Sequence, residues 1–411
     1  MRIKPYYACI LPMLILLAGC QKQQPTSVTV NNQAKAATSL PGFPLSYQNA
    51  GVTQRVIAFD NGSGLNCFLA YDLGTEQVSM IQASGGSYTA LWSTTGLNID
   101  GQIFHFGVTS YATYDAPMDE VSGTHMIALD FGQNGHLSYL LVYIPGSGIA
   151  MLLQNMGNGA WHSLFTSYSG IGGYDLKNGW DKIIAYDLGS GHKNSLICYR
   201  PFNGVFWVLQ NQPNTQNPVV NWVAVVKSSG GVGGFDLKGI EDNLIAVDNT
   251  PGNMDLVCYR PGNGYIWYLN HQANTTLWTT KWTSRTGFTG TFDFSQWYDR
   301  MVPYDADGTG TQNYMFCWRA GSKGYDAIVK MSGSGFAYKT PGGDFSSYPM
   351  QANPTYVPPG WSGAPGYADH IVPFAGNSYG LGSILCYEPG DNLADIYLLN
   401  NPGASSFTFA Y

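Results

Sequence analysis

Short apolar runs alternate along the chain with turns rich in glycine, asparagine and proline. One pattern recurs six times: an apolar run ending near an aspartate, a polar turn, a second apolar run ending in an aromatic residue, and a turn of the Pro-Gly type. The six copies begin at Val56–Asp60, Met126–Asp130, Ile183–Asp187, Leu244–Asp248, Met301–Asp305 and His370–Phe374, the last without the aspartate. The second-run aromatics follow in step at Tyr71, Tyr143, Tyr199, Tyr259, Trp318 and Tyr387. The chain therefore contains an internal repeat.

Each copy holds four strand-like runs separated by turn residues. In the third copy these runs are Lys182–Asp187, Ser195–Tyr199, Val205–Gln210 and Trp222–Lys227. Four strands cannot bury both of their faces alone, so the copies must stack around a common axis, as in a β-propeller, whose repeats are roughly 40–50 residues or longer. The pattern predicts an all-β fold, a single propeller of six four-stranded blades over residues 42–411. Seven blades are the alternative if Thr94–Thr124 hides a degenerate copy.

The composition supports this fold and excludes two classes of protein. Charged residues make up 11% of the 411, whereas aromatic residues make up 14% and glycine contributes 51 residues. Disordered chains are rich in charge and poor in aromatics, so disorder is excluded. The formal net charge is −7 and the basic residues form no run, so we expect no nucleic-acid partner.

The N-terminus has the pattern of a bacterial export signal. Residues 1–19 hold a basic start and an apolar stretch too short to span a bilayer. They end in Leu17-Ala18-Gly19, directly before Cys20, which resembles a lipobox and implies lipid attachment at Cys20. Residues 20–41 are polar and predict a flexible tether. We therefore expect a lipid-anchored protein of the cell envelope, at the outer membrane with its face left open; the alternative is an ordinary signal peptide with a chance cysteine.

The later cysteines fall at repeat positions. Cys198, Cys258, Cys317 and Cys386 each stand directly before the second-run aromatic, and Cys67 lies in the first copy. Equivalent positions in neighbouring blades should lie farther apart than the roughly 7 Å between Cα atoms that a disulfide tolerates. We expect buried, unpaired thiols that pack between blades.

Catalytic and metal-binding motifs are weak. Gly376–Gly380 fits the G-x-S-x-G pattern, but it fills a turn between two strands, whereas a nucleophile elbow needs a strand-to-helix turn. Asp305–Gly310 resembles half a calcium loop without the distal glutamate. The seven histidines are scattered and lack zinc-site spacing. We expect no catalytic residues, no metal and no cofactor, although separate loops of a propeller can still assemble a site.

The third and fourth copies carry the most specific motifs. Gly172–Lys177 reads GGYDLK and Gly233–Lys238 reads GGFDLK, while Tyr259–Trp267 reads YRPGNGYIW and Tyr199-Arg200-Pro201 begins its counterpart. These motifs resemble the repeat of the Photorhabdus-type propeller lectins. The resemblance implies a propeller that binds sugars, notably fucose and related or methylated sugars, in pockets between neighbouring blades.

Aromatic rings beside arginine and aspartate suit sugars, because a pyranose has an apolar face to stack and hydroxyls to pair. The candidate sugar-binding residues are Trp267, Tyr259, Arg260, Trp207, Tyr199, Arg200, Asp175 and Asp236. The alternative is that the tyrosines pack between blades and the aspartates cap turns.

The leading hypothesis is a lipid-anchored, lectin-like propeller with glycan partners. The alternatives are an envelope scaffold without sugar pockets and, less favoured, a loop-built glycan-processing enzyme. The oligomeric state is left open.

Overall fold

The computed structural model describes residues 54–61, 66–84, 87–107, 123–250, 253–272, 275–288, 292–305, 312, 314–319, 326–332, 335–341, 370–375, 382–387, 396–400 and 408–409. All of them belong to one compact unit, Thr38–Tyr411. The predicted signal peptide, the lipidation site Cys20 and the tether lie outside the described residues. The turn Gly376–Gly380 lies outside them too, as does the loop that follows Asp305 up to Gly310.

The described strands form six sheets. Sheet one contains β1 (Gln54–Asp60), β2 (Asn66–Asp72), β3 (Gln77–Ser84) and β4 (Ser87–Thr95). Sheet two contains β5 (Leu97–Ile99), β6 (Gln102–Phe104), β7 (His125–Leu129), β8 (Tyr139–Ile144), β9 (Ile149–Gly157) and β10 (Ala160–Ser167). Sheet three contains β11 (Lys182–Tyr186), β12 (Ser195–Arg200), β13 (Val205–Asn211) and β14 (Trp222–Ser228).

The remaining three sheets also have four strands each. Sheet four contains β15 (Asn243–Thr250), β16 (Asn253–Arg260), β17 (Tyr265–His271) and β18 (Trp278–Ser284). Sheet five contains β19 (Asp299–Tyr304), β20 (Tyr314–Arg319), β21 (Asp326–Ser332) and β22 (Gly335–Pro341). Sheet six contains β23 (His370–Ala375), β24 (Gly382–Tyr387), β25 (Ile396–Asn400) and β26 (Thr408–Phe409). The described residues include no helix, and so none that could cross a membrane.

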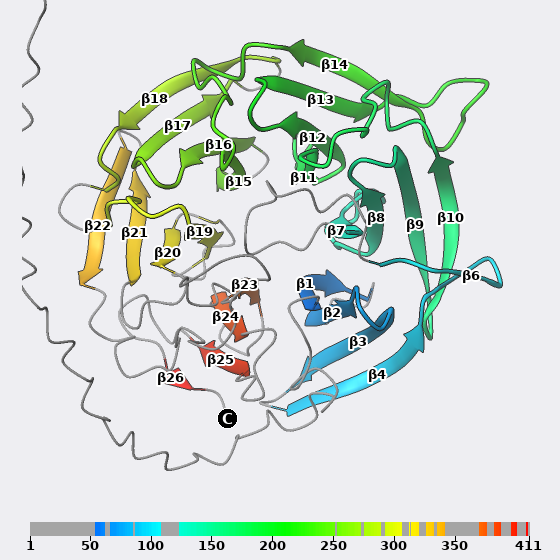
Figure 1. Ribbon diagram of the computed structural model, residues 1–411. Helices are drawn as coiled ribbons and strands as arrows, with labels where there is room; N and C mark the ends of the chain where they lie inside the picture. Colours follow the sequence, from blue (N-terminus) through cyan, green and yellow to red (C-terminus); the bar gives the residue numbers. More distant parts are fainter. Residues whose placement is uncertain are drawn as a thin grey trace, which may run out of the picture. The chain divides into compact units, whose positions relative to one another are not determined.

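The sheets stand around a ring, as Figure 1 shows. The first strand of each repeat is innermost, and β1, β7, β11, β15, β19 and β23 each contact the next in that order. Strand β23 also contacts β1, so the ring is closed. The prediction of an all-β propeller is confirmed, and the four runs predicted in the third copy coincide with β11–β14 to within a residue or two.

The stretch Thr94–Thr124 adds strands to sheet two. Within its described part, β5 and β6 form a hairpin, and β5 pairs in parallel with the outer strand β10. Sheet two is therefore six-stranded, where four strands were predicted. No seventh sheet occurs among the described residues.

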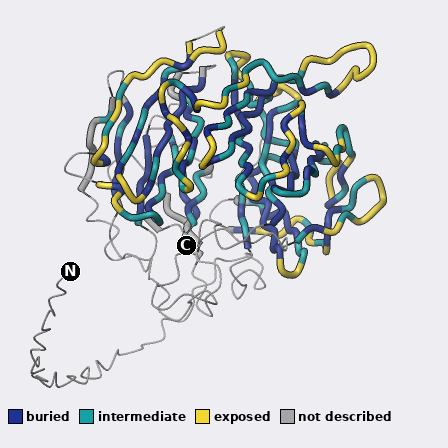
Figure 2. Tube along the Cα trace, turned by 45° about the horizontal axis from the view of Figure 1, so that its top comes forward, coloured by how far each residue is buried: buried dark blue, intermediate teal, exposed yellow. Residues whose placement is uncertain are grey.

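Burial decreases from the middle strands of a sheet to the outer one. Residues Ser195–Tyr199 of β12 are all buried because sheets two and four cover both faces of the strand, whereas most residues of the outer strand β18 are exposed or half-buried. Figure 2 shows the same distribution, with buried inner strands and exposed outer turns. Continuous apolar runs in the middle strands are what burial on two faces requires.

Tyrosines of the second strand join neighbouring sheets. The hydroxyl oxygens of Tyr71, Tyr143 and Tyr199 accept hydrogen bonds from the backbone N–H of Met126, Ile183 and Leu244, at 3.3, 3.1 and 3.3 Å. Each bond runs from one sheet to the innermost strand of the next. The recurrent aromatic therefore holds successive blades in register.

Replacing Tyr199 by Phe removes the acceptor for Leu244 N–H. Because the lost bond lies in the core, we expect the free energy of unfolding to fall by about 1–2 kcal/mol. Chemical denaturation of the two proteins measures this difference. An unchanged unfolding free energy would show that water replaces the hydroxyl at no cost.

The cysteines of the described repeats lie in the core. Cys67, Cys198 and Cys258 are free and buried, and Cys317 occupies the position in sheet five equivalent to Cys198 and is also buried. Burial raises the pKa of Cys67 to about 11 and raises the pKa values of Cys198 and Cys258 well above their usual range. The prediction of buried thiols is confirmed for these residues; the side chain of Cys386 lies outside the description.

Candidate functional site

One face of sheet four gathers the side chains that the repeat motif predicts. Arg260 of β16 pairs with Tyr265 of β17, and Trp267 pairs with Thr283 of β18. Residues two apart on a strand point to the same side. The four side chains therefore share a face, and Arg285 follows Thr283 by two residues. Trp267 packs against the apolar cluster between sheets three and four, so this face is directed at sheet three.

A tight turn in the segment between β14 and β15 forms the opposite wall. Backbone hydrogen bonds of 2.9 Å join Val232 and Phe235 in both directions. The two central residues, Gly233 and Gly234, have φ angles of +57° and +96°, a combination that glycine adopts without strain and that characterises type I′ turns. A Cβ at Gly234 would lie 2.8 Å from Cζ3 of Trp267. The second glycine of the motif therefore lets the turn approach the indole.

Arg260 connects the segment between β14 and β15 to sheet four through hydrogen bonds. Its Nε and Nη2 donate to the two carboxylate oxygens of Asp242 at 2.5 and 2.7 Å, and Nη2 also donates to Asp236 Oδ1 at 2.6 Å. The Asp242 side chain is fully buried, whereas that of Asp236 is 50% exposed. A bidentate pair with a buried carboxylate fixes the plane of the guanidinium. The arginine is thus held in one orientation beside Trp267.

These pairs set the charges of the site. The hydrogen bonds that Arg260 donates to Asp242 and Asp236 raise the pKa of Arg260 above its ordinary value. Burial alone would raise the pKa of Asp236, but hydrogen bonds from Arg260 and from the backbone N–H of Lys238 outweigh burial and hold it below its ordinary value. Burial raises the pKa of Asp242, which Arg260 opposes. Asp236 is therefore an anion and Arg260 a cation at neutral pH.

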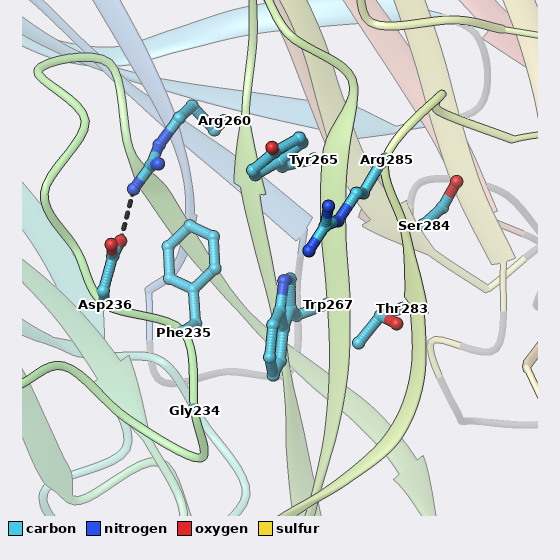
Figure 3. Close-up of a pocket in the computed structure, with 9 residues that line it drawn as sticks. All are labelled: Gly234, Phe235, Asp236, Arg260, Tyr265, Trp267, Thr283, Ser284 and Arg285. Atoms are coloured by element: carbon cyan, nitrogen blue, oxygen red, sulfur yellow. Dashed lines mark hydrogen bonds and ion pairs between the residues drawn. The ribbon is translucent and has the colours of Figure 1, made fainter.

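The turn and the sheet enclose a pocket of about 340 Å³, near the lower end of the roughly 300–1,000 Å³ typical of small-molecule sites. It is lined by Gly234, Phe235, Asp236, Arg260, Tyr265, Trp267, Thr283, Ser284 and Arg285 (Figure 3). Three of its polar groups have no partner among the described residues: Nη1 of Arg260, Oδ2 of Asp236 and the hydroxyl of Thr283. Two donors and an acceptor thus remain available next to an indole ring.

The same arrangement recurs between sheets two and three, with a covered tryptophan. Arg200 pairs with Asp181 and Asp175, each at 2.6 Å, as Arg260 does with its aspartates. Trp207 takes the place of Trp267, but Lys227 pairs with it on the outer strand and lies with Nζ 4.1 Å from the centre of the Trp207 ring. The position that Thr283 leaves open in sheet four is therefore occupied by a lysine in sheet three.

Sheet five retains the ion pairs and lacks the tryptophan. Arg319 donates to Asp299 and Asp293, in each case at 2.6 Å. The residue that pairs with Cys317, where Trp267 pairs with Cys258, is Ala327. The Arg–Asp–Asp cluster therefore belongs to the architecture of the repeat, and the tryptophan distinguishes sheets three and four. The described residues contain no group of three or more metal-ligating side chains placed to hold an ion.

The predicted site residues divide into three groups. Trp267, Arg260 and Asp236 line the pocket together, and Trp207, Arg200 and Asp175 form its counterpart one sheet earlier. Tyr199 and Tyr259 are only 2% and 3% exposed and belong to the apolar clusters between blades. Their rings offer no face to a sugar, so for these two tyrosines the packing alternative holds.

Sequence reasoning missed several lining residues. Phe235, Tyr265, Thr283, Ser284 and Arg285 line the pocket but were not among the candidates. The two-residue period of a strand could have indicated Tyr265 from Trp267. Thr283 and Arg285 required the pairing of β17 with β18, which the motif does not encode. Asp181, Asp242 and Asp299 were missed as well, although each follows the motif aspartate by the same short spacing.

Known proteins resemble this chain in general shape only. No family model matches the chain, and no curated protein matches it in sequence. An Agrocybe aegerita lectin that recognises non-reducing terminal N-acetylglucosamine is 13% identical with a TM-score of 0.48, over 87% of this chain and 80% of that one. The six-bladed, fucose-recognising Aleuria aurantia lectin is 9% identical with a TM-score of 0.47, over 88% and 96%. A periplasmic gluconolactonase of Pseudomonas aeruginosa is 9% identical with a TM-score of 0.39, over 69% and 68%. We draw no functional inference from likenesses of this size, and the Photorhabdus-type resemblance stays a prediction.

Proposed function

We propose that the protein is a carbohydrate-binding propeller whose sugar site is the pocket between sheets three and four. The observation that carries this proposal is the arrangement around Trp267. A half-buried indole lies beside a fixed guanidinium with one nitrogen available, a carboxylate with one oxygen available, and a threonine hydroxyl.

The chemistry of a pyranose fits these groups. One face of the ring carries C–H bonds, which pack on an aromatic surface, while the hydroxyls around the edge both donate and accept hydrogen bonds. Nη1 of Arg260 can donate to a hydroxyl oxygen, and Oδ2 of Asp236 can accept from a neighbouring hydroxyl. Hydrogen bonds to charged groups are the stronger kind. Because Asp242 already fixes the guanidinium, little side-chain entropy is lost when the sugar binds.

The lining residues favour binding over catalysis. Glycoside hydrolysis typically uses two carboxylates that flank the scissile bond. The pocket presents one carboxylate, Asp236, and Arg260 holds it as an anion. The second carboxylate of the cluster, Asp242, is fully buried behind Arg260. We therefore propose a lectin-like role without turnover.

A glycan array probed with soluble protein of residues 41–411 tests the proposal. The resemblance to the Photorhabdus-type lectins makes fucose and methylated sugars the first neutral ligands to include. Absence of binding to every glycan up to about 1 mM, where the binding free energy would be only about −4 kcal/mol, would favour a scaffold without sugar pockets. Release of cleaved sugar from a bound glycan would instead favour an enzyme.

We further propose that the propeller is held at a bacterial membrane, at the outer membrane, by a lipid on Cys20. The lipid is inferred from the sequence Leu17-Ala18-Gly19-Cys20, and the outer membrane from Gln21, because no acidic residue directly follows the cysteine. Replacing Cys20 by Ser should release the protein from the membrane fraction or leave the precursor uncleaved. Fractionation followed by immunoblotting measures this, and unchanged membrane attachment of the variant would contradict the proposal.

A further inference from the structure

Arg285 is a cation of the pocket that the protein leaves without an anion. It follows the last residue of β18 and lines the pocket together with Thr283 and Ser284. Its guanidinium makes no hydrogen bond or ion pair with any described residue, and its Cζ atom lies 5.7 Å from the centre of the Tyr265 ring. All five donors of Arg285 are therefore available to a ligand.

A second cation lies near the same ring. The Cζ atom of Arg260 is 5.9 Å from the centre of the Tyr265 ring, so one aromatic residue has two guanidinium groups beside it. Asp242 and Asp236 compensate the charge of Arg260. Arg285 has no such carboxylate partner among the described residues, so an anionic group of a ligand could take that place.

We infer that the pocket takes a pyranose bearing an anionic substituent, either a carboxylate or a sulfate ester, and that Arg285 is the residue that selects it. The inference rests on the proposed function, because it assumes that the ring stacks on Trp267. The planar guanidinium matches an oxyanion with two parallel hydrogen bonds, a geometry that lysine does not offer.

The distribution of charge also orients the ligand. In Figure 3, Asp236 and Arg260 lie on one side of the pocket, and Arg285 lies on the other side, near Tyr265 and Trp267. An oxyanion is repelled by Asp236 and attracted by Arg285. The anionic substituent therefore lies at the Arg285 end, while neutral hydroxyls face Asp236 and Nη1 of Arg260.

The counterpart between sheets two and three lacks this selectivity. Ser229 stands where sheet four has Arg285, and Val205 where it has Tyr265. Lys227 is directed onto Trp207. Of these two described sites, we therefore expect only the pocket of sheet four to select acidic sugars.

Matched pairs of sugars test the inference by calorimetry on residues 41–411. The probes are the methyl glycosides of galactose and glucose, those of galacturonic and glucuronic acid, and a sulfated galactose. An acidic sugar should bind roughly ten- to hundredfold more tightly than its neutral partner, and increasing salt should reduce the difference. The carboxylate and sulfate arms show which oxyanion the pocket prefers.

The Arg285→Gln variant supplies the decisive comparison. It should lose the preference and bind neutral and acidic sugars about equally. Lys281→Gln is the matched control, because it removes one positive charge from the same strand while its ammonium contacts Tyr268 and Asp255 and lines no part of the pocket. It should keep the preference, and all three proteins should melt alike.

Two results would overturn the inference, and they differ in what they say of the proposed function. Equal binding of neutral and acidic sugars by the unmodified protein, or an acid preference that survives Arg285→Gln, would refute the selection and leave the sugar site in place. Binding of neither class by the unmodified protein would refute the sugar site and the inference together.

Discussion

A chain that ends before His370 should lose cooperative folding altogether, which is the largest effect expected from any change considered for this protein. The deletion removes β23–β26, and with them the strand that contacts both β19 and β1. Each blade buries its faces only against its neighbours, so the truncated ring would expose two apolar sheet faces at once. That loss is comparable with the roughly 5–15 kcal/mol by which a native protein is stable.

Thermal unfolding and size-exclusion chromatography measure this outcome. Removal of residues 1–41, the predicted signal peptide and tether, which are similar in length, should leave the melting transition in place and serves as the control. A compact, soluble five-sheet remainder with a sharp transition would contradict the claim that closure is required.

Replacing Trp267 by Ala should weaken sugar binding roughly ten- to hundredfold. The substitution removes both the stacking surface and the apolar area that the sugar covers, and about 1.4 kcal/mol corresponds to a factor of ten in Kd. The affinity and the melting temperature must be measured together. Weaker binding at unchanged melting identifies a contact with the ligand, whereas lower melting with intact affinity per folded molecule would make Trp267 a packing residue.

Trp207→Ala is the matched control for this experiment. Trp207 has the same register position in sheet three, but Lys227 covers its ring. We expect its loss to leave the affinity within about twofold of the original, well under the tenfold that 1.4 kcal/mol would give. If Trp207→Ala abolished binding and Trp267→Ala did not, the sugar site would lie between sheets two and three.

The two tryptophans show where sequence reasoning about the site stops. Both follow a turn that contains glycine, and both are the last residue of equivalent motifs, so the sequence ranks them together. What separates them is the residue opposite on the outer strand, Lys227 in one sheet and Thr283 in the other. In both sheets the pairing with the outer strand shifts by one residue next to this position, between Val208 and Leu209 of β13 and between Tyr268 and Leu269 of β17, a shift that the motif does not encode.

The sequence by itself determined the repeat, the strands and the ring. These follow from local patterns, because the order of apolar runs and turn residues within one copy dictates four strands, and six copies with the same apolar faces must stack on one another. It also identified Trp267, Arg260 and Asp236 within two motifs of one copy, and the structure places them in one pocket.

The tertiary structure alone decided which side chains remain available. Tyr199 and Tyr259 belong to the same motifs as the arginines that follow them. Their rings are nevertheless buried between blades, because successive residues of a strand point to opposite faces. The pairing of β5 with β10, the burial of Asp242 behind Arg260 and the isolation of Arg285 all depend on segments far apart in the sequence. The spacing of apolar residues describes one strand at a time. A binding site forms where side chains of several strands and turns come together, and only the packed ring determines which of them do.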